Sequence, residues 1–274
     1  MADLYLSTSE EVSRLMTQCY STSFGMASRL FAKQIRQDIY NIYGFVRVAD
    51  EIVDTYTGKD RLALLDAFEQ QTYQDLTRGY STNLVIHAFV STCLQFGISK
   101  TLIAPFIESM RMDTGAKRYT VDKYQQYIYG SAEVVGLMCL KVFCQGDNAE
   151  YKKLEPGARA LGAAYQKVNF LRDIHDDHER LGRYYFPVGT FKAFDEATKE
   201  AIVADISADF ATAKIAIEQL PASAQKAVKA SYIYYSALLQ KLKATPAERI
   251  KQQRIRVADW QKVLLLVRVK AGLL

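Results

Sequence analysis

Residues 161–187 read LGAAYQKVNFLRDIHDDHERLGRYYFP and place two aspartates, Asp173 and Asp177, four residues apart. Residues 42–54 read IYGFVRVADEIVD and repeat this spacing with Asp50 and Asp54. A spacing of four on a helix stacks two carboxylates on one face, about 6 Å apart along the axis. Two such pairs, far apart in the sequence, predict helices that present their carboxylates to a shared cation site.

Each aspartate pair needs a positive partner, because two like charges at this spacing destabilise a helix by about 0.2–0.5 kcal/mol. Oxygen ligands suit Mg²⁺, which usually binds through one or two carboxylates together with substrate phosphates. An arginine precedes each pair closely, Arg47 in one segment and Arg172 in the other, and its planar fork fits phosphate oxygens. The pattern therefore predicts a Mg²⁺–diphosphate site that faces a cavity between helices.

The alternative interpretation of each pair is the solvated end of an amphipathic helix. Further polar residues on the same helix faces favour the ligand cluster, because buried polar groups need partners and a bound ligand supplies them. These stripes are Tyr43, Arg47 and Asp50 in the first segment, and Gln166, Asn169, Asp173 and Asp177 in the second.

The rest of the sequence is typical of one all-α domain over residues 1–274. Its 274 residues are 49% hydrophobic and 24% charged, so a sizeable core is available. Only five prolines interrupt the chain, and apolar residues recur at three- and four-residue intervals, as in helices. We expect a structured loop at 182–192. Helices are expected at 7–19, 34–56, 59–78, 83–96, 99–113, 122–144, 152–181, 196–218, 221–243 and 256–270.

Charge and hydropathy limit the partners of the chain. The net charge of +5 is spread without a basic block, which argues against nucleic acid. The N-terminus lacks a basic segment followed by an apolar core, and no window approaches about 18 uninterrupted apolar residues, so we expect a cytoplasmic protein without a membrane span. The apolar tail Val263–Leu274 packs as a final helix or touches a bilayer as a peripheral contact. The oligomeric state stays open.

Four segments resemble the phytoene/squalene synthase family, in the family's order and from about residue 18 to 270. The segment at 127–136 departs from the family pattern at Ile128, Ser131 and Glu133, while Tyr127 and Gly136 remain in place. The segments at 21–24 and 42–54 are closest in sequence to bacterial phytoene synthases. The four segments are STSF at 21–24, IYGFVRVADEIVD at 42–54, YIYGSAEVVG at 127–136, and residues 161–187.

This resemblance implies an all-α isoprenoid synthase bundle around a central cavity, which joins two prenyl diphosphates head to head. It also implies a requirement for Mg²⁺, for which Mn²⁺ can substitute, and none for NADPH. The implied metal ligands are Asp50, Asp54, Asn169, Asp173 and Asp177. Tyr127 joins the four aspartates as an implied catalytic residue. The implied substrate-binding residues are Ser21, Ser23, Phe24, Tyr43, Arg47, Gln166, Asn169, Arg172, Arg183 and Tyr185.

The reaction expected from the resemblance is the condensation of two geranylgeranyl diphosphates to phytoene, through a cyclopropylcarbinyl diphosphate. The alternatives are a squalene, dehydrosqualene or presqualene diphosphate synthase that uses C15 farnesyl diphosphate, a non-catalytic assembly factor of the family, and a lipid-binding module. An allylic carbocation requires a dry cavity with aromatic rings, whose faces attract a cation by about 0.5–2 kcal/mol. Candidates for such rings are Phe24, Tyr43, Phe45, Tyr127 and Tyr129.

Two further groups of residues allow more than one interpretation. His175 and His178 could mimic a zinc site with Asp176, but the resemblance favours positions beside the acidic ligands or in solvent. Arg111 and Asp113 lie in a segment that resembles family sequence near the cavity, and a salt bridge that caps a helix explains them equally well.

Overall fold

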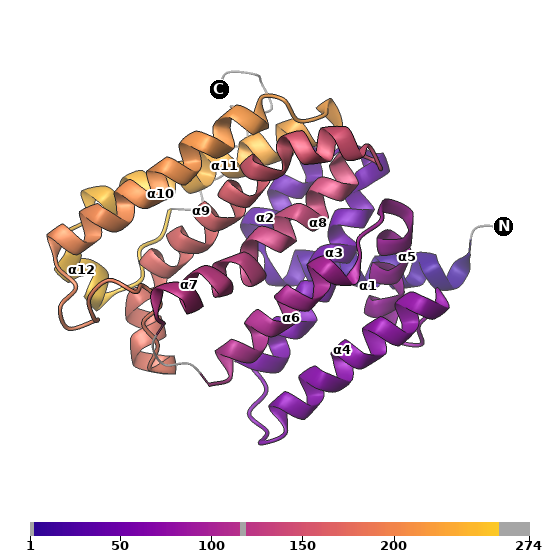
Figure 1. Ribbon diagram of the computed structural model, residues 1–274, viewed down its shortest axis with the longest axis horizontal. Helices are drawn as coiled ribbons and strands as arrows, with labels where there is room; N and C mark the ends of the chain where they lie inside the picture. The colour runs from indigo at the N-terminus through magenta and orange to yellow at the C-terminus, as the bar shows by residue number, and fades with distance from the viewer. Residues whose placement is uncertain (1–2, 116–118, 258–274) are drawn as a thin grey trace.

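The computed structural model describes residues 3–115 and 119–257, and this part of the chain forms a bundle of helices without a strand (Figure 1). The elements are α1 (Leu4–Tyr20), α2 (Thr22–Ala27), the 3₁₀-helix η1 (Ser28–Leu30), α3 (Lys33–Asp54), α4 (Arg61–Arg78), α5 (Leu84–Phe96), α6 (Lys100–Asp113), α7 (Val121–Ile128), the π-helix η2 (Tyr129–Glu133), α8 (Val134–Phe143), α9 (Asn148–Leu181), α10 (Glu196–Ile217), α11 (Ala222–Ala244) and α12 (Ala247–Gln252).

The expected all-α fold is confirmed, and most expected helices are present with ends that differ by a few residues. The helix expected at 122–144 is present as α7, η2 and α8, because the backbone winds as a π-helix in its middle. The short helices α2 and α12 lie where the sequence predicts none. Each has six residues, which is less than about two helical turns and too short to show a hydrophobic period. Of the helix expected at 256–270, residues 256–257 are not helical, and the remainder lies outside the described residues.

Helix α9 carries more of the predicted site residues than any other element that the structure describes. Its 34 residues span about 51 Å at 1.5 Å per residue. The Asp147 side chain caps its start by accepting hydrogen bonds from the next turn, and Gly182 ends it in the left-handed conformation with a φ of 64°. Helices α8, α10, α11 and α12 all pack against α9, and Figure 1 shows α10 and α11 running beside it.

Two apolar clusters fill the bundle on the two sides of the site. The first lies among α3, α5, α6 and α8, where the Phe45 and Phe89 rings stack with centroids 3.9 Å apart. The second lies among α7, α9, α10 and the loop after α9, where Phe170 stacks on Tyr185 with centroids 4.0 Å apart. Phe45 is fully buried in the first cluster and is therefore a core residue.

The π-helix η2 lies unusually close to α6, because Gly130 has no side chain. A Cβ atom on Gly130 would sit 2.2 Å from the carbonyl oxygen of Pro105. This close approach helps to bring the end of α6, at Asp113, against Tyr127, which lies in the last turn of α7. Single π turns inside helices are frequent at functional sites.

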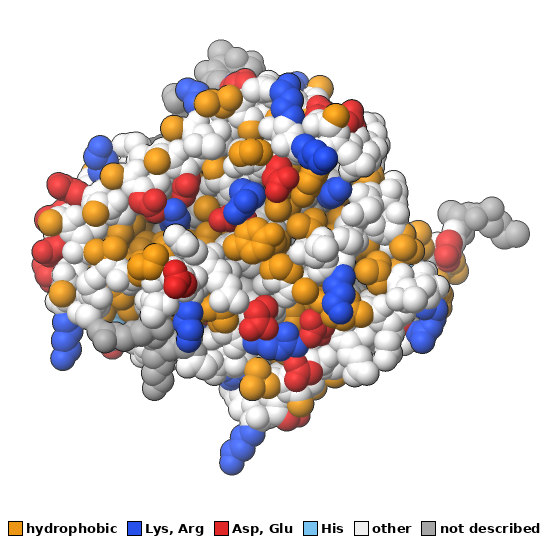
Figure 2. Space-filling view, viewed as in Figure 1, with side chains coloured by type: hydrophobic (Ala, Val, Ile, Leu, Met, Phe, Trp, Pro, Cys, Tyr) orange, Lys and Arg blue, Asp and Glu red, His pale blue; other side chains and the backbone are white. Residues whose placement is uncertain are grey.

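The surface shown in Figure 2 carries acidic and basic side chains that are interspersed, with hydrophobic side chains between them. This distribution agrees with a net charge that is spread along the sequence. Within residues 3–115 and 119–257, no helix has both the length and the apolar character that crossing a bilayer requires. The expected membrane contact of Val263–Leu274 falls outside the described residues.

Candidate active site

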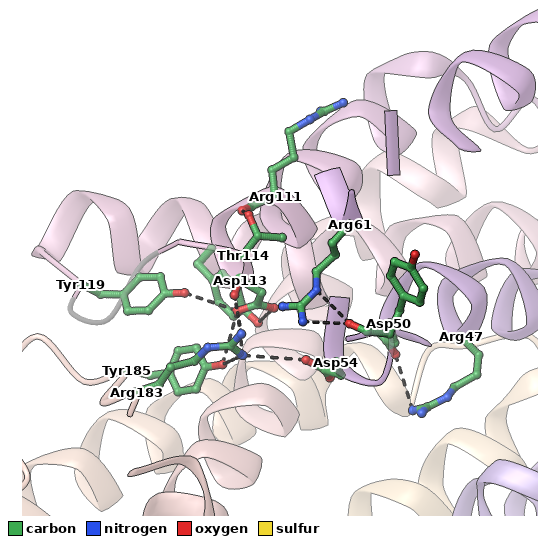
Figure 3. A network of polar contacts seen from close by, with 12 residues as sticks. Arg47, Asp50, Asp54, Arg61, Arg111, Asp113, Thr114, Tyr119, Arg183 and Tyr185 are labelled. Carbon is green, nitrogen blue, oxygen red and sulfur yellow. Dashed lines mark hydrogen bonds and ion pairs between the residues drawn. The ribbon is translucent and has the colours of Figure 1, made fainter. Parts of the chain in front are cut away.

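The centre of the candidate site is an ion pair between Arg183, which follows α9, and Asp113 at the end of α6 (Figure 3). Arg183 Nη1 lies 3.5 Å from Asp113 Oδ1, and both side chains are buried. The same guanidinium donates to the backbone carbonyl of Asp113 and, at 3.1 Å, to the Tyr185 hydroxyl. The hydroxyls of Tyr127 and Tyr185 donate to the Asp113 carboxylate over 2.6 and 3.3 Å. Asp113 is therefore a fully partnered buried carboxylate.

The first acidic pair reaches this centre from the last turn of α3. Arg183 Nη1 lies 3.8 Å from Asp54 Oδ1, so one guanidinium contacts carboxylates from α3 and α6. Burial raises the pKa of Asp50 to about 7, Arg47 opposes this shift, and the charges of Asp54 and Asp113 add to it. Burial also raises the pKa of Asp54, although Arg183 opposes it. Each member of the first pair thus has one arginine as an ion-pair partner, and burial still raises its pKa.

The second acidic pair, in the last turns of α9, has two members in different states. Burial raises the pKa of Asp177 to about 7, and the charges of Asp173 and Asp113 add to this shift, while Arg183 opposes it. Asp173, in contrast, is held by two guanidinium groups: Arg172 Nε lies 2.8 Å from its Oδ1, and Arg254 Nε lies 2.7 Å from the same oxygen. The two pairs face a common centre, because Asp113 acts electrostatically on both Asp50 and Asp177.

These residues fit a divalent cation of the Mg²⁺ type. The donors are carboxylate oxygens, and burial, together with the charges of neighbouring carboxylates, raises the pKa of Asp50 and of Asp177 to about 7. Within the described residues, no three His, Cys, Asp or Glu side chains converge as a ready-made metal cage. Mg²⁺ does not need such a cage, because it keeps several other ligands and binds through one or two carboxylates plus substrate phosphates.

Arg47 and Tyr43, the other two residues of the first polar stripe, lie beside the acidic pair of Asp50 and Asp54. Arg47 forms a close ion pair with Glu51, lies 3.9 Å from Asp50, and stacks over the Tyr20 ring. The Arg47 Nε is buried without a hydrogen-bond partner. Burial raises the pKa of Tyr43, and a hydrogen bond with Ser21 lowers it. Arg47 thus has a donor that a bound oxyanion could satisfy.

An apolar cavity of about 330 Å³ adjoins these stripes. Ser21 and Gln166 are among its lining residues, and Tyr235, which also lines it, donates a hydrogen bond to Asn169 Oδ1 over 3.4 Å. The side chains of Ser23 and Phe24 lie outside what the structure describes. Much of the remaining wall is aliphatic, with residues such as Ile39, Val135, Leu140, Leu154, Ile217, Leu220 and Val228.

The aromatic wall of the cavity differs from the sequence expectation. The rings that line it are those of Phe31, Phe143, Tyr165, Tyr234 and Tyr235, and Tyr165 stacks on Tyr235 with centroids 4.0 Å apart. Tyr129 borders a separate groove, where Arg159 lies over its ring. The run YIYY at 232–235 contains Tyr234 and Tyr235. Tyrosines within a predicted helix are equally typical of a hydrophobic core, so the run does not identify them as cavity residues.

Asp113 is the central residue that the sequence does not single out. Asp113 pairs with Arg183 at the centre of the candidate site, and its position near the cavity stays a prediction, because neither residue is among those that line the cavity. The predicted cap with Arg111 is wrong, since Arg111 points away from Asp113 and pairs with Asp66 and Glu69 (Figure 3). The only available sequence signal is the resemblance of this segment to family sequence.

The histidines lie beside the second pair without joining a metal cluster. His175 Nδ1 lies 2.8 Å from the carbonyl oxygen of Lys251, which identifies the ring as the donor. His178 stacks on Phe191 with ring centroids 3.7 Å apart, and its Nδ1 lies 3.0 Å from Glu179. Both positions agree with the expectation that these side chains lie beside the ligands or in solvent.

An all-helical bundle with acidic pairs and arginines beside an apolar cavity is the architecture of helical isoprenoid synthases. Residues 17–261 match the family model described as "Squalene/phytoene synthase", and the chain belongs to this family of prenyltransferase-type synthases. The expected family membership is thereby confirmed.

Curated relatives carry the name phytoene synthase. The chain is 34% identical over 172 residues to phytoene synthase 3 of Zea mays, a match that covers 61% of this chain and 40% of that protein. It is 33% identical over 202 residues to phytoene synthase of Arthrospira platensis, covering 69% and 64%. A 28% identical match to 15-cis-phytoene synthase of Synechococcus elongatus covers 95% and 92%. The matches to the first two relatives thus span less than two thirds of their lengths.

Solved structures share the fold. A squalene synthase, HpnC, from Alicyclobacillus acidocaldarius has a TM-score of 0.78 and 22% identity, covering 93% of this chain and 98% of that one. A dehydrosqualene synthase in complex with a ligand has a TM-score of 0.80 and 20% identity, covering 98% and 97%. These structures confirm the expected isoprenoid synthase fold.

Replacing Asp113 by Asn tests whether the buried ion pair organises the site. Asp113→Asn leaves the Arg183 charge short of a partner, and we expect a loss of about 1–3 kcal/mol in the free energy of unfolding. Asp66→Asn is the matched control, because Asp66 pairs with Arg111 at an exposed position and such pairs contribute at most about 1 kcal/mol. Urea denaturation measures both, and equal losses would contradict the central role of Asp113.

The raised pKa values predict how Mg²⁺ stabilises the protein at different pH. The pKa of Asp50 and of Asp177 is about 7, above the ordinary value of 3.8. The folded protein therefore binds protons more tightly than the unfolded chain, and these groups destabilise it as pH rises from about 4 to 7. A bound cation relieves this repulsion, so Mg²⁺ should raise the midpoint of thermal unfolding more at pH 8 than at pH 5.5. An equal rise at both pH values would contradict the assignment.

Proposed function

We propose that the protein is a Mg²⁺-dependent prenyltransferase that condenses two geranylgeranyl diphosphates head to head into phytoene and releases two diphosphates. One observation carries the proposal: acidic pairs from α3 and α9 share the Arg183–Asp113 centre, beside an apolar cavity. The names of the curated relatives support the choice of product.

The part of the site that carries the acidic pairs and the arginines would hold the diphosphates. Arg47 and Arg172 now pair with the carboxylates of Glu51 and Asp173, and phosphate oxygens fit the same guanidinium fork. Asp50, Asp54, Asp173 and Asp177 would hold Mg²⁺, with Asn169 completing the second set. When bound, Mg²⁺ neutralises the charge that develops on the departing diphosphate. Mn²⁺ would substitute for it in the same oxygen ligands.

Tyr127 would act as a neutral hydroxyl. Burial, followed by the charge of Asp113, raises its pKa well above the ordinary value. The phenol therefore stays protonated and donates to Asp113 over 2.6 Å. This bond fixes the ring against Phe170 and Tyr185, with centroids 5.8 and 5.3 Å away. Tyr127 and Tyr185 thus form a rigid wall that orients substrate, and neither hydroxyl serves as a base at neutral pH.

The apolar cavity would hold the prenyl chains and exclude water. After the first diphosphate departs, C1 of one chain bonds across the C2–C3 double bond of the other and loses a proton, which gives a cyclopropylcarbinyl diphosphate. Loss of the second diphosphate, rearrangement and loss of a second proton give phytoene. This sequence needs no reductant, so NADPH is not expected. The Tyr165 and Tyr235 rings in the cavity wall would present aromatic faces to the cation.

A synthase that uses C15 farnesyl diphosphate is the second candidate. The cavity of about 330 Å³ lies at the lower end of the range of about 300–1,000 Å³ for ligand pockets, which favours shorter chains. Incubation with C15 or C20 diphosphate, with and without NADPH, separates the candidates by product mass. Phytoene from C20 substrate without NADPH is the expected result, and squalene formed with NADPH would overturn it.

Removing one acidic residue from either pair tests the metal assignment. Asp50→Ala and Asp173→Ala should each lower Mg²⁺-dependent diphosphate release at least about 100-fold, because charge stabilisation of this kind supplies such factors. Circular dichroism should show unchanged helical content. Glu200→Ala on the exposed face of α10 is the control and should keep full activity. Full activity in either aspartate variant would refute the assignment.

A further inference from the structure

The last described segment, residues 253–257, crosses α9 beside the second acidic pair. We call it the C-terminal strap. It follows α12 and starts extended, with Gln253 at φ −160° and ψ 150°. Ile255 and Val257 are buried in the second apolar cluster, whereas Arg254 and Arg256 are exposed. The strap therefore alternates buried apolar residues with exposed arginines.

Two hydrogen bonds to backbone carbonyls on either side of Arg254 hold this stretch of chain in place. His175, midway between Asp173 and Asp177 on α9, donates its Nδ1 hydrogen to the carbonyl oxygen of Lys251, in the last turn of α12, over 2.8 Å. On the other side, Lys241 on α11 donates to the carbonyl oxygen of Arg256. Lys251 precedes Arg254 by three residues, and Arg256 follows it by two. A side chain between the two metal-ligand candidates thus anchors the chain where the strap begins.

The strap delivers Arg254 to Asp173. Arg254 Nε lies 2.7 Å from Asp173 Oδ1, and its Nη2 lies 3.3 Å from Oδ2. Arg172 contacts the same two oxygens from within α9. Both oxygens of Asp173 are therefore shared between two guanidinium groups. Asp177, one turn later, makes no ion pair within 4 Å among the described residues.

We propose that His175 is a positioning residue, which anchors the C-terminal strap so that Arg254 serves as the resident counter-ion of Asp173. A divalent cation that binds at Asp173 and Asp177 displaces Arg254 from the Asp173 oxygens, which the cation uses as ligands. The inference rests on the proposed metal assignment of Asp173 and Asp177. It makes the strap a determinant of how tightly the ligand-free protein binds metal.

Binding of Mn²⁺ to the full chain, without diphosphate, tests the proposal through the electron paramagnetic resonance signal of free Mn²⁺. Arg254→Gln should bind Mn²⁺ about three- to ten-fold more tightly at the second pair, since it removes one charge-assisted competitor. His175→Ala should shift the affinity in the same direction. His175→Asn keeps a side-chain N–H donor and should behave as the wild type. Adding Asp177→Asn to Arg254→Gln should abolish the gain, which assigns it to the second pair.

Arg256→Gln is the matched control, because Arg256 lies in the same strap and, among the described residues, its hydrogen bond is made by its backbone carbonyl and not by its side chain. It should leave Mn²⁺ affinity unchanged. Unchanged or weaker affinity in Arg254→Gln would overturn the proposal, and a wild-type value in His175→Ala would reject the positioning role. A merely structural role would lower the thermal midpoint without tightening Mn²⁺ binding.

Condensation assays on the same preparations separate this inference from the proposed function. Product formation by the wild type without any shift of Mn²⁺ affinity in the variants would reject the strap proposal alone. The expected affinity shifts in a protein that forms no product would reject the proposed reaction and leave the strap proposal standing.

Discussion

One buried guanidinium, that of Arg183, balances carboxylates from three helices, and the arrangement of the site depends on it. It contacts Asp54 from α3 and Asp113 from α6, and it lowers the pKa of Asp177 on α9. Burial raises the pKa of Asp50 and of Asp177 to about 7, and the charges of neighbouring carboxylates add to this shift. A divalent cation bound among these carboxylates would offset their mutual repulsion, which is why we propose the metal site here.

Burying the Arg183–Asp113 ion pair is costly, and the surrounding contacts explain how the fold tolerates it. Taking charges out of water costs several kcal/mol per ion unless geometry and hydrogen bonds compensate. Tyr127 and Tyr185 satisfy the oxygens of Asp113, and the stacking of Tyr185 on Phe170 fixes the loop that carries Arg183. The rings of Tyr127, Tyr185 and Phe170 and the Arg183–Asp113 ion pair thus pack as one unit. This packing couples the stability of the bundle to the geometry of the site.

The sequence predicts the features of this site that are periodic along a helix. Asp50 with Asp54, and Asp173 with Asp177, repeat at the helical spacing, so the helices and the carboxylates on them follow directly. Asp113 has no repeat, and its importance comes from the close packing of η2 on α6 at Gly130, a contact between segments distant in sequence. The contact of Arg254 with Asp173 could not be predicted from the sequence for the same reason, because it depends on how the chain turns after α11 and α12.

Identical spacing in the two acidic pairs does not give them identical electrostatics. Arg183 and Arg47 act on the first pair from one side, and the pKa of Asp50 stays raised. In the second pair, two arginines converge on Asp173 while Asp177 is left with a raised pKa. A cation at the first pair would meet two carboxylates with one arginine partner each, whereas a cation at the second pair would compete with two guanidinium groups for Asp173. Under the proposed function, diphosphate oxygens would be alternative partners for these guanidinium groups, and diphosphate binding would leave Asp173 available to the metal.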